Sequence, residues 1–247
     1  PIPSRGLGDV YKRQQLDGFE NTVSLSDDNE FIIIEGDEYL SSPIDSSPKF
    51  FKYKANIALI SGISWDHINV FESPQVYANQ FSLFIDTIVD GGVVVYNELD
   101  TTVKDIVMNN QSFVRKIEYN LPDYNISDNQ IFINSDEGQI PLQIFGKHNL
   151  SNLEGARKIC SLLGVFDEDF YNSISSFIRL HSSSSEAFSS RVILRRAWNL
   201  RRNIIFHRGI SVVTVSTAGP RYSRSIIVML SPTMKLTMKS TNDAAPM

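Results

Sequence analysis

Apolar residues follow one another in short runs, and longer stretches with a helical repeat separate these runs. Continuous apolar runs at Phe31–Ile34, Ile57–Ile60 and Val93–Tyr96 are typical of strands that are buried on both faces. Between the last two runs, Ser73-Pro74 provides an N-cap and a first-turn proline for a helix reaching about Val89. A second helix is expected over residues 101–108. This alternation predicts an α/β fold with a largely parallel sheet.

The next part of the chain predicts closely spaced strands and one more helix. Strands are expected at about residues 115–119, 130–134 and 140–145, and their spacing favours an antiparallel extension. Asp136-Glu137-Gly138 is expected to join the last two as a hairpin. A helix is then expected from Asn149 to residue 163. Its core-facing positions are Leu153, Ala156, Cys160 and Leu163.

The first two apolar runs lead into groups that can bind a cation. These groups are Glu35, Asp37 and Glu38 after the first run, and Asp66 and His67 after the second. Open α/β sheets bind ligands at the carboxyl edge of their strands. Mg²⁺ prefers carboxylates together with phosphate oxygens and water. The sequence therefore predicts a metal and phosphate site. The alternative is a solvated acidic loop, and an Asp-His pair by itself is a weak signal.

A third polar segment lies at the start of the helix that is predicted from Asn149. Asn149 and Asn152 lie within one turn, and His148 precedes them. An N-cap role would explain Asn149, but it explains neither Asn152 nor His148. An asparagine amide offers a donor and an acceptor side by side, which suits the N6 and N7 positions of adenine. The segment therefore favours adenine binding.

Together these segments resemble the Mur ligase family of ATP-dependent amide-forming enzymes of peptidoglycan metabolism. The resemblance covers about residues 15–178. It is greatest for the branches that join a murein tripeptide, or L-alanine, to UDP-N-acetylmuramate. The motifs that carry it are Glu35-Gly36-Asp37-Glu38-Tyr39, Pro48-Lys49-Phe50, Trp65-Asp66-His67-Ile68-Asn69-Val70-Phe71, and His148-Asn149 with Asn152.

The resemblance implies two cofactors, ATP and Mg²⁺, and roles for particular residues. Glu35 would bind magnesium and His67 a second magnesium, while Asn149 and Asn152 would read adenine. His148 belongs to the nucleotide motif without a definite role. ATP would phosphorylate the muramyl carboxylate to an acyl phosphate, and the amine of the incoming peptide would displace phosphate. The implied fold is the central ATP-binding domain of the family, in truncated form.

Other interpretations of the same residues remain open. A metal-dependent phosphoesterase could use Glu35, Asp37, Asp66 and His67, and a non-catalytic remnant could retain adenine affinity. The ligase is preferred because it alone accounts for the His-Asn-x-x-Asn segment. Lys49, in the Ser- and Pro-rich loop at residues 39–53, is a candidate anion contact or a solvated surface lysine.

The distribution of charge along the chain and the composition of its ends predict a division into three parts. Residues 1–14 resemble translated adaptor sequence, with a genuine disordered arm as the alternative, and residues 15–178 form the ATP-binding domain. The formal charge is −13 for residues 1–180 and +8 for residues 181–247, which together give the −5 of the chain. A basic segment can bind nucleic acid. Its apolar runs at residues 204–206, 212–213 and 226–230 instead predict strands, so we expect a divergent or frame-shifted segment from residue 179 and no nucleic-acid partner.

The sequence lacks the phosphate-binding loop of the family. No Gly-Lys-Thr or Gly-Lys-Ser occurs in the 247 residues, although the family uses such a loop to hold phosphates. The chain is therefore expected to be an interior fragment, inactive alone.

Cys160 is the only cysteine, which fits a core position and a reducing compartment. No apolar run reaches the length of a membrane span, so a cytoplasmic bacterial location and no membrane partner are expected.

Overall fold

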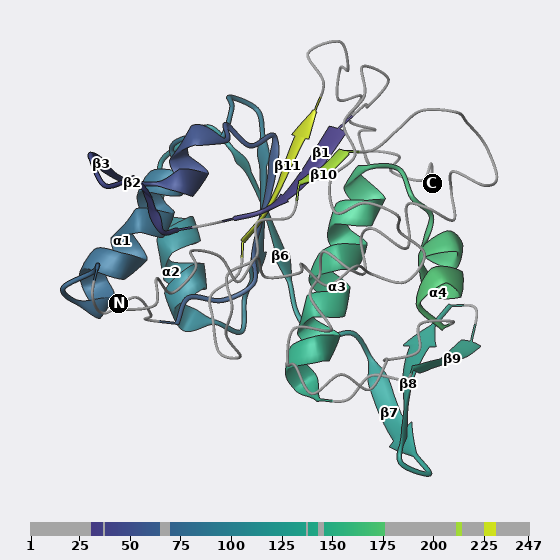
Figure 1. The fold of residues 1–247 in the computed structure, drawn as a ribbon. Helices are drawn as coiled ribbons and strands as arrows, with labels where there is room; N and C mark the ends of the chain where they lie inside the picture. The colour runs from purple at the N-terminus through teal and green to yellow at the C-terminus, as the bar shows by residue number, and fades with distance from the viewer. Residues whose placement is uncertain are drawn as a thin grey trace, which may run out of the picture.

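A computed structural model shows a three-layer α/β/α arrangement around a six-stranded sheet (Figure 1). Helices α1 (Pro74–Ile85) and α2 (Thr101–Asn109) lie on one side, and α3 (Lys147–Leu162) and α4 (Asp167–Ser175) on the other. The structure describes residues 31–36, 38–64, 70–136, 138–142, 146–175, 211–213 and 225–230.

The main sheet is largely parallel, as the sequence predicts. Its order is β10-β1-β11-β4-β5-β6. The pairs β4–β5, β5–β6 and β1–β10 are parallel, whereas β11 is antiparallel to both of its neighbours. The strands are β1 (Phe31–Glu35), β4 (Ile57–Ile60), β5 (Val93–Asn97), β6 (Arg115–Tyr119), β10 (Ser211–Val213) and β11 (Ser225–Leu230).

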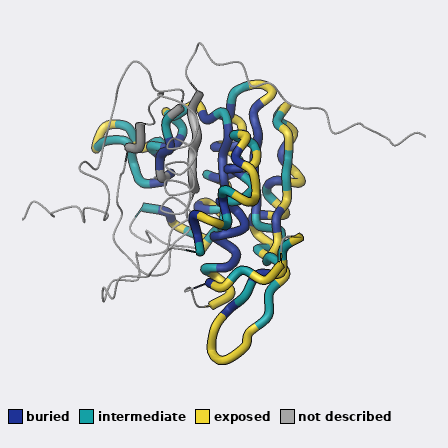
Figure 2. Tube along the Cα trace, turned by 90° about the vertical axis from the view of Figure 1, so that its right-hand side faces the viewer, coloured by how far each residue is buried: buried dark blue, intermediate teal, exposed yellow. Residues whose placement is uncertain are grey.

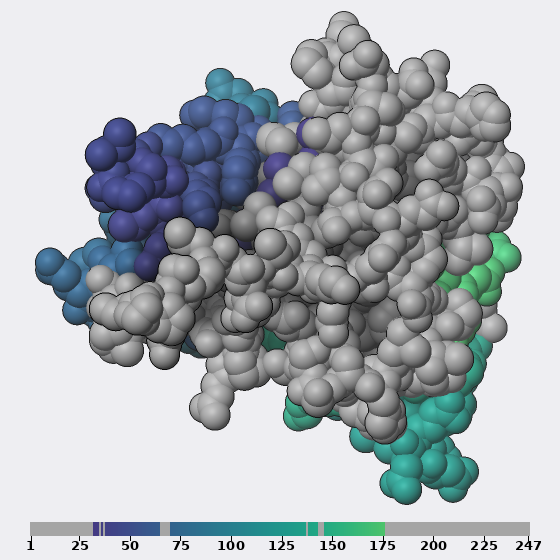
Figure 3. Space-filling model, viewed as in Figure 1, coloured from purple at the N-terminus to yellow at the C-terminus, as the bar shows by residue number. Residues whose placement is uncertain are grey.

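The expected antiparallel extension is a separate three-stranded sheet. It contains β7 (Tyr124–Ser127), β8 (Gln130–Ser135) and β9 (Gly138–Leu142) in that order. The hairpin expected at residues 136–138 is confirmed, because β8 pairs antiparallel with β9. Residues 127–130 at the tip of the β7–β8 hairpin are exposed, and this hairpin projects from the body of the molecule (Figures 2 and 3).

Several boundaries differ from the predictions. Helix α1 ends at Ile85 and not near Val89, and α3 begins at Lys147, two residues before Asn149. The loop at residues 39–53 is not irregular throughout, because it contains a short hairpin and a 3₁₀ turn. These elements are β2 (Leu40–Ser42), β3 (Asp45–Pro48) and η1 (Lys49–Lys52). Serine-rich strands of three or four residues have too short an alternation to be recognised in the sequence.

Alternate residues of the central strands build two cores, one on each face of the sheet. Ile57 and Leu59 of β4 belong to the cluster that includes Leu153 of α3. Ala58 and Ile60 belong to the cluster on the side of α1 and α2. All four β4 residues are buried, as expected for a strand covered on both faces. The buried stretches occupy the centre of the layers in Figure 2.

Two strands from the basic C-terminal segment join the main sheet. The strands predicted at residues 212–213 and 226–230 correspond to β10 and β11. β11 lies between β1 and β4. The predicted strand at residues 204–206 and the proposed adaptor at residues 1–14 lie outside the described residues. Within the described ranges no helix is long and apolar enough to span a membrane.

Candidate functional site

The carboxyl ends of β1 and β4 lie at the same edge of the sheet. Glu35, the last residue of β1, is paired with Ile226 of β11, and Ile226 is paired with Leu59 of β4. Glu35 and Leu59 therefore lie in one row, two strand spacings or about 10 Å apart. The backbone confirms the expected shared edge, with β11 inserted between the two strands. The side chain of Glu35, as well as Asp37, Asp66 and His67, lies outside the described part of the chain, so their metal contacts remain predictions.

Glu38, which follows the carboxyl end of β1, contacts helix α1. Its side chain is buried, with 7% exposure. The hydroxyl of Tyr77 in α1 donates a hydrogen bond of 3.0 Å to Oε1 of Glu38. This contact ties the turn after β1 to helix α1, because the two residues are 39 positions apart in sequence. A buried carboxylate with a hydrogen-bond donor is a stable arrangement without a cation.

The segment after β4 is held by the connection from β5 to α2. Asn97, at the end of β5, donates a side-chain hydrogen bond of 3.0 Å to the carbonyl of Ser61. The N–H of Ile63 donates to Oδ2 of Asp100 at 3.0 Å. Neither Asn97 nor Asp100 is recognisable in the sequence as part of this site. Asp100 before two threonines is a recognisable N-cap, but its contact with Ile63 depends on the tertiary fold.

The nucleotide motif comes together on the first turns of α3. Gly146 is the N-cap, with a φ of 89° that suits glycine. Asn149 therefore lies inside the helix, and the N-cap interpretation of that residue is wrong. Asn152 is 3% exposed, and its Nδ2 lies 3.3 Å from Nε2 of His148, which is itself exposed. The residues expected to read adenine thus share one helix end, and adenine binding itself remains a prediction.

Comparison with known proteins identifies the family. The family model described as "Mur ligase middle domain" matches residues 23–159. This chain belongs to the Mur ligase family. The match covers more than half of the 247 residues and includes all the motif segments that suggested the family.

Two curated relatives are bacterial ligases. The chain is 26% identical over 159 residues to the UDP-N-acetylmuramate–L-alanyl-γ-D-glutamyl-meso-2,6-diaminoheptandioate ligase of Haemophilus influenzae, covering 61% of this chain and 35% of that protein. It is 30% identical over 160 residues to the UDP-N-acetylmuramate–L-alanine ligase of Caldicellulosiruptor bescii, covering 60% and 34%. The chain therefore spans about a third of the length of the curated relatives that it matches.

A solved structure supports the fold. The crystal structure of UDP-N-acetylmuramate:L-alanyl-γ-D-glutamyl-meso-diaminopimelate ligase from Neisseria meningitides superposes with a TM-score of 0.50 and 18% identity. The superposed region covers 60% of this chain and 48% of the chain in that structure. At this level of identity the likeness establishes a shared fold, and the fold class expected from the sequence is confirmed.

In this Mur ligase chain, helix α3 lies close to the sheet at Gly155. A Cβ atom at residue 155 would lie 3.0 Å from Cζ of Tyr119 and 3.1 Å from Cδ1 of Leu59. The close approach fixes the position of the helix that carries Asn149 and Asn152. Burial raises the pKa of Tyr119 above its usual value; nearby Ser151 slightly opposes this shift. Within the described ranges, the hydroxyl groups of Tyr119 and Ser151 have no hydrogen-bond partner.

An ion-pair network joins α3 to α4. Arg157 donates to both carboxylate oxygens of Glu154, at 2.8 and 2.6 Å, and to Asp167 at 2.8 Å. The hydrogen bonds to Glu154 raise the pKa of Arg157 further. Since a guanidinium is charged throughout the physiological range in any case, the network has a structural role. It connects the nucleotide-motif helix to the first turn of α4.

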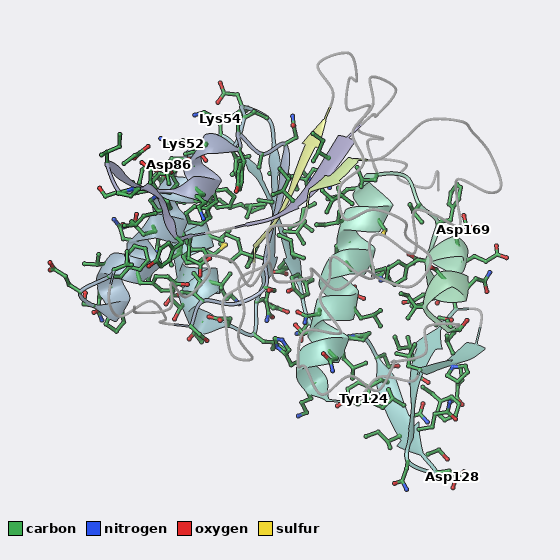
Figure 4. The ribbon with its side chains drawn as sticks, viewed as in Figure 1. Lys52, Lys54, Asp86, Tyr124, Asp128 and Asp169 are labelled. Atoms are coloured by element: carbon green, nitrogen blue, oxygen red, sulfur yellow. The ribbon has the colours of Figure 1, made fainter. Side chains whose placement is uncertain are left out.

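The lysines of the 39–53 region differ in their surroundings. Lys49 is half-buried, and its Nζ lies 6.0 Å from the centre of the Tyr39 ring. Lys52 forms an ion pair of 2.9 Å with Asp45. Hydrogen bonds from Ser47 and Lys52 hold the pKa of Asp45 well below its usual value. Figure 4 places Lys52 and Lys54 on the α1 side of the sheet, away from α3. Lys49 as an anion contact remains a prediction.

Within the described residues, no group of three or more His, Cys, Asp or Glu side chains is arranged to hold a metal ion. The expected donor set combines Glu35 with His67, and Glu35 ends β1 at the same edge as β4. One carboxylate and one imidazole, completed by phosphate oxygens and water, are suitable ligands for a divalent cation. By residue type, Glu35 and His67 therefore fit the cation that the family implies, and their meeting at this edge remains a prediction.

Proposed function

We propose that this chain forms the metal- and nucleotide-binding centre of an ATP-dependent ligase. The enzyme would join a murein tripeptide, or L-alanine, to UDP-N-acetylmuramate in the bacterial cytoplasm during peptidoglycan recycling or biosynthesis. The observation that carries the proposal is the match to the Mur ligase middle domain over residues 23–159. This range contains both predicted magnesium residues and the whole His-Asn-x-x-Asn segment.

We also propose a division of the chain into three parts, which is consistent with the same match. Residues 15–178 would be the ATP-binding domain, with residues 1–14 as a non-native tail and residues 179–247 as a divergent segment. The family match lies wholly inside the first of these ranges. Substrate-selecting contacts would lie in parts of the longer relatives that this chain does not match, since it covers about a third of their length.

The proposed mechanism depends on positioning and charge neutralisation. Phosphoryl transfer from ATP to the muramyl carboxylate accumulates charge on phosphate oxygens, and the bound magnesium ions would neutralise it. Glu35 and His67 would hold these ions without exchanging protons. Asn149 and Asn152 would orient adenine, and Lys49 would contact an anionic group. The peptide amine would then displace phosphate from the acyl phosphate and form the amide.

Calorimetric titration of the 247-residue chain with ATP tests this proposal. We expect Mg²⁺-dependent binding that weakens about tenfold or more in Glu35→Gln, because one of the few protein ligands of the metal is lost. Glu72→Gln is the matched control, since Glu72 is an exposed carboxylate outside the motifs.

The same samples separate the ligase from a phosphoesterase. A ligase centre is expected to leave p-nitrophenyl phosphate intact in the presence of Mn²⁺. Hydrolysis of this ester, combined with no measurable ATP binding, would contradict the proposed function and favour metal-dependent phosphoester chemistry at the same acidic residues.

A further inference from the structure

The carboxylate of Asp100 serves two segments that are distant in sequence. Oδ1 accepts the N–H of Val103 at 3.1 Å, which caps helix α2. Oδ2 accepts the N–H of Ile63 at 3.0 Å, across 37 positions of sequence. Capping a helix requires only one side-chain oxygen. The second oxygen therefore acts on the segment that follows β4.

Asn97 makes a second contact with residues 61–63. The amide of Asn97 donates to the carbonyl of Ser61 at 3.0 Å, while its oxygen accepts the N–H of Leu99 at 3.1 Å. A Cβ atom at Gly62 would lie 3.4 Å from Oδ2 of Asp100, so the carboxylate lies directly against the backbone. Residues 61–63 are thus held at a carbonyl and at an amide, just beyond the point where β4 ends at Ile60.

This segment leads directly to the predicted metal ligand. His67 follows Ser64 by three residues, and β4 ends at the same edge of the sheet as Glu35. A loop that is already ordered loses less conformational entropy when it binds a ligand. Groups outside the ligand shell commonly tune metal affinity by orienting the ligands. We therefore expect a restraint on residues 61–63 to limit the positions that His67 can adopt.

We propose that Asp100 is a positioning residue for the metal site, which it serves by fixing residues 61–63, which precede His67 in sequence. The inference rests on the proposed function. Asp100 touches neither metal nor nucleotide in this role; it holds the backbone that carries a ligand. A purely structural role would end at the cap of α2, and the two roles can be separated because each uses a different carboxylate oxygen.

The variant Asp100→Asn separates the two roles. Asparagine caps a helix as well as aspartate does, but its Nδ2 cannot accept the N–H of Ile63. We expect an unchanged circular-dichroism spectrum and retained protection of Val103, with the melting temperature lowered by no more than a few degrees. We expect hydrogen exchange at Ile63 to accelerate about tenfold or more, since one hydrogen bond to a charged acceptor is lost. Asp105→Asn is the matched control, because Asp105 is an exposed aspartate of the same helix.

Metal affinity is measured in the same proteins. The chain has two tryptophans, so Trp198→Phe leaves Trp65, two residues from His67, as the only tryptophan, whose selectively excited emission reports paramagnetic quenching by Mn²⁺. We expect the dissociation constant for Mn²⁺ to rise about tenfold in Asp100→Asn, within the range seen for groups that orient metal ligands. Asp105→Asn is expected to match the parent protein.

The outcomes distinguish the inference from the proposed function. Equal Mn²⁺ affinity in Asp100→Asn and the parent, or unchanged exchange at Ile63, overturns the positioning role. Failure of the parent chain to bind Mn²⁺ at all contradicts the proposed function instead. If Asp100→Asn does not fold, Asp100→Ser provides the same comparison, because serine also caps the helix but is too short to reach Ile63.

Discussion

Buried and half-buried polar side chains around the sheet edge connect segments that are far apart in sequence. Glu38 reaches Tyr77 and Asp100 reaches Ile63, whereas Asn152 meets His148 one turn away in the same helix. A buried polar group without a partner costs free energy, so such contacts restrict the backbone strongly. The proposed site therefore depends on residues that position its ligands as well as on the ligands themselves.

The role of Asn152 is tested by Asn152→Ala. We expect ATP affinity to fall about tenfold or more, because a paired donor and acceptor to adenine contributes about 1–3 kcal/mol. Affinity for Mn²⁺ without nucleotide should stay unchanged, because the predicted metal ligands are elsewhere. Ser161→Ala, an exposed position of the same helix, serves as the control.

Titration calorimetry with each ligand provides the comparison. Because Asn152 is buried, its loss could also disturb folding. Equal losses of ATP and Mn²⁺ affinity would therefore indicate a folding defect, and unchanged ATP affinity would remove Asn152 from the adenine site.

At the level of helices and strands, the packing of α3 against the sheet determines where the nucleotide motif lies. Gly155 is buried in the middle of this helix, where it faces Tyr119 and Leu59. Glycine is unfavourable in a helix interior relative to alanine by about 1 kcal/mol. Its presence here is explained by close packing, because a methyl group would press against the side chains of Tyr119 and Leu59.

Gly155→Ala tests this packing. A new Cβ would lie 3.0 Å from Cζ of Tyr119 and 3.1 Å from Cδ1 of Leu59, so these buried side chains must give way by a few tenths of an ångström. We expect the free energy of unfolding to fall by about 1–3 kcal/mol from overpacking, outweighing the gain in helix propensity. Urea denaturation measures the change. A more stable variant would show that α3 does not depend on this close approach.

The strength of a local signal explains which elements could be predicted. Apolar runs such as Ile57–Ile60 and the Ser73-Pro74 helix start were recognisable because burial and capping leave local marks. β7 and α4 were not predicted: β7 has only four half-exposed or exposed residues, and α4 begins with three acidic residues. The insertion of β11 between β1 and β4 is set by pairing across about 170 residues, which no local pattern records.

Predictions for the site divide in the same way. Residues such as Glu35 and Asn152 could be proposed from residue type and position relative to strand and helix ends. Asp100 and Asn97 could not, because their contacts with residues 61–63 arise from the tertiary fold. The contact of Glu38 with Tyr77 was hidden for the same reason, since the pair spans two elements.

The molecule as a whole buries several groups that ionise only at high pH. Burial raises the pKa of the Cys160 thiol and of Tyr119, and it raises the pKa of Tyr171 to about 12. All three residues belong to the core on the α3 side of the sheet or pack against it. Ionisation of any of these acids is therefore expected to destabilise this core.

Stability is accordingly expected to fall at alkaline pH. Above about pH 8.5 the unfolded chain loses the Cys160 proton, whereas the folded chain keeps it. The folded state then binds more protons than the unfolded state, so the free energy of unfolding decreases as pH rises. The slope approaches about 1.4 kcal/mol per pH unit for each such group.

Urea denaturation between pH 7 and pH 9.5 measures this effect. Cys160→Ala should flatten the decline in that range, because the tyrosines ionise in the unfolded chain only near about pH 10. A parent protein with constant stability up to pH 9.5, or a variant with an unchanged slope, would contradict the burial of a protonated thiol.

The central claim is that Glu35 and His67 meet at one divalent-cation centre at the shared edge of β1 and β4. Pulsed electron paramagnetic resonance of Mn²⁺ bound to the 247-residue chain tests it directly, because a coordinated imidazole nitrogen modulates the electron spin echo. We expect a nitrogen coupling that persists in His148→Ala, disappears in His67→Ala, and requires Glu35 for binding of the ion. A coupling that survives His67→Ala, or Mn²⁺ affinity unaffected by Glu35→Gln, would contradict the account.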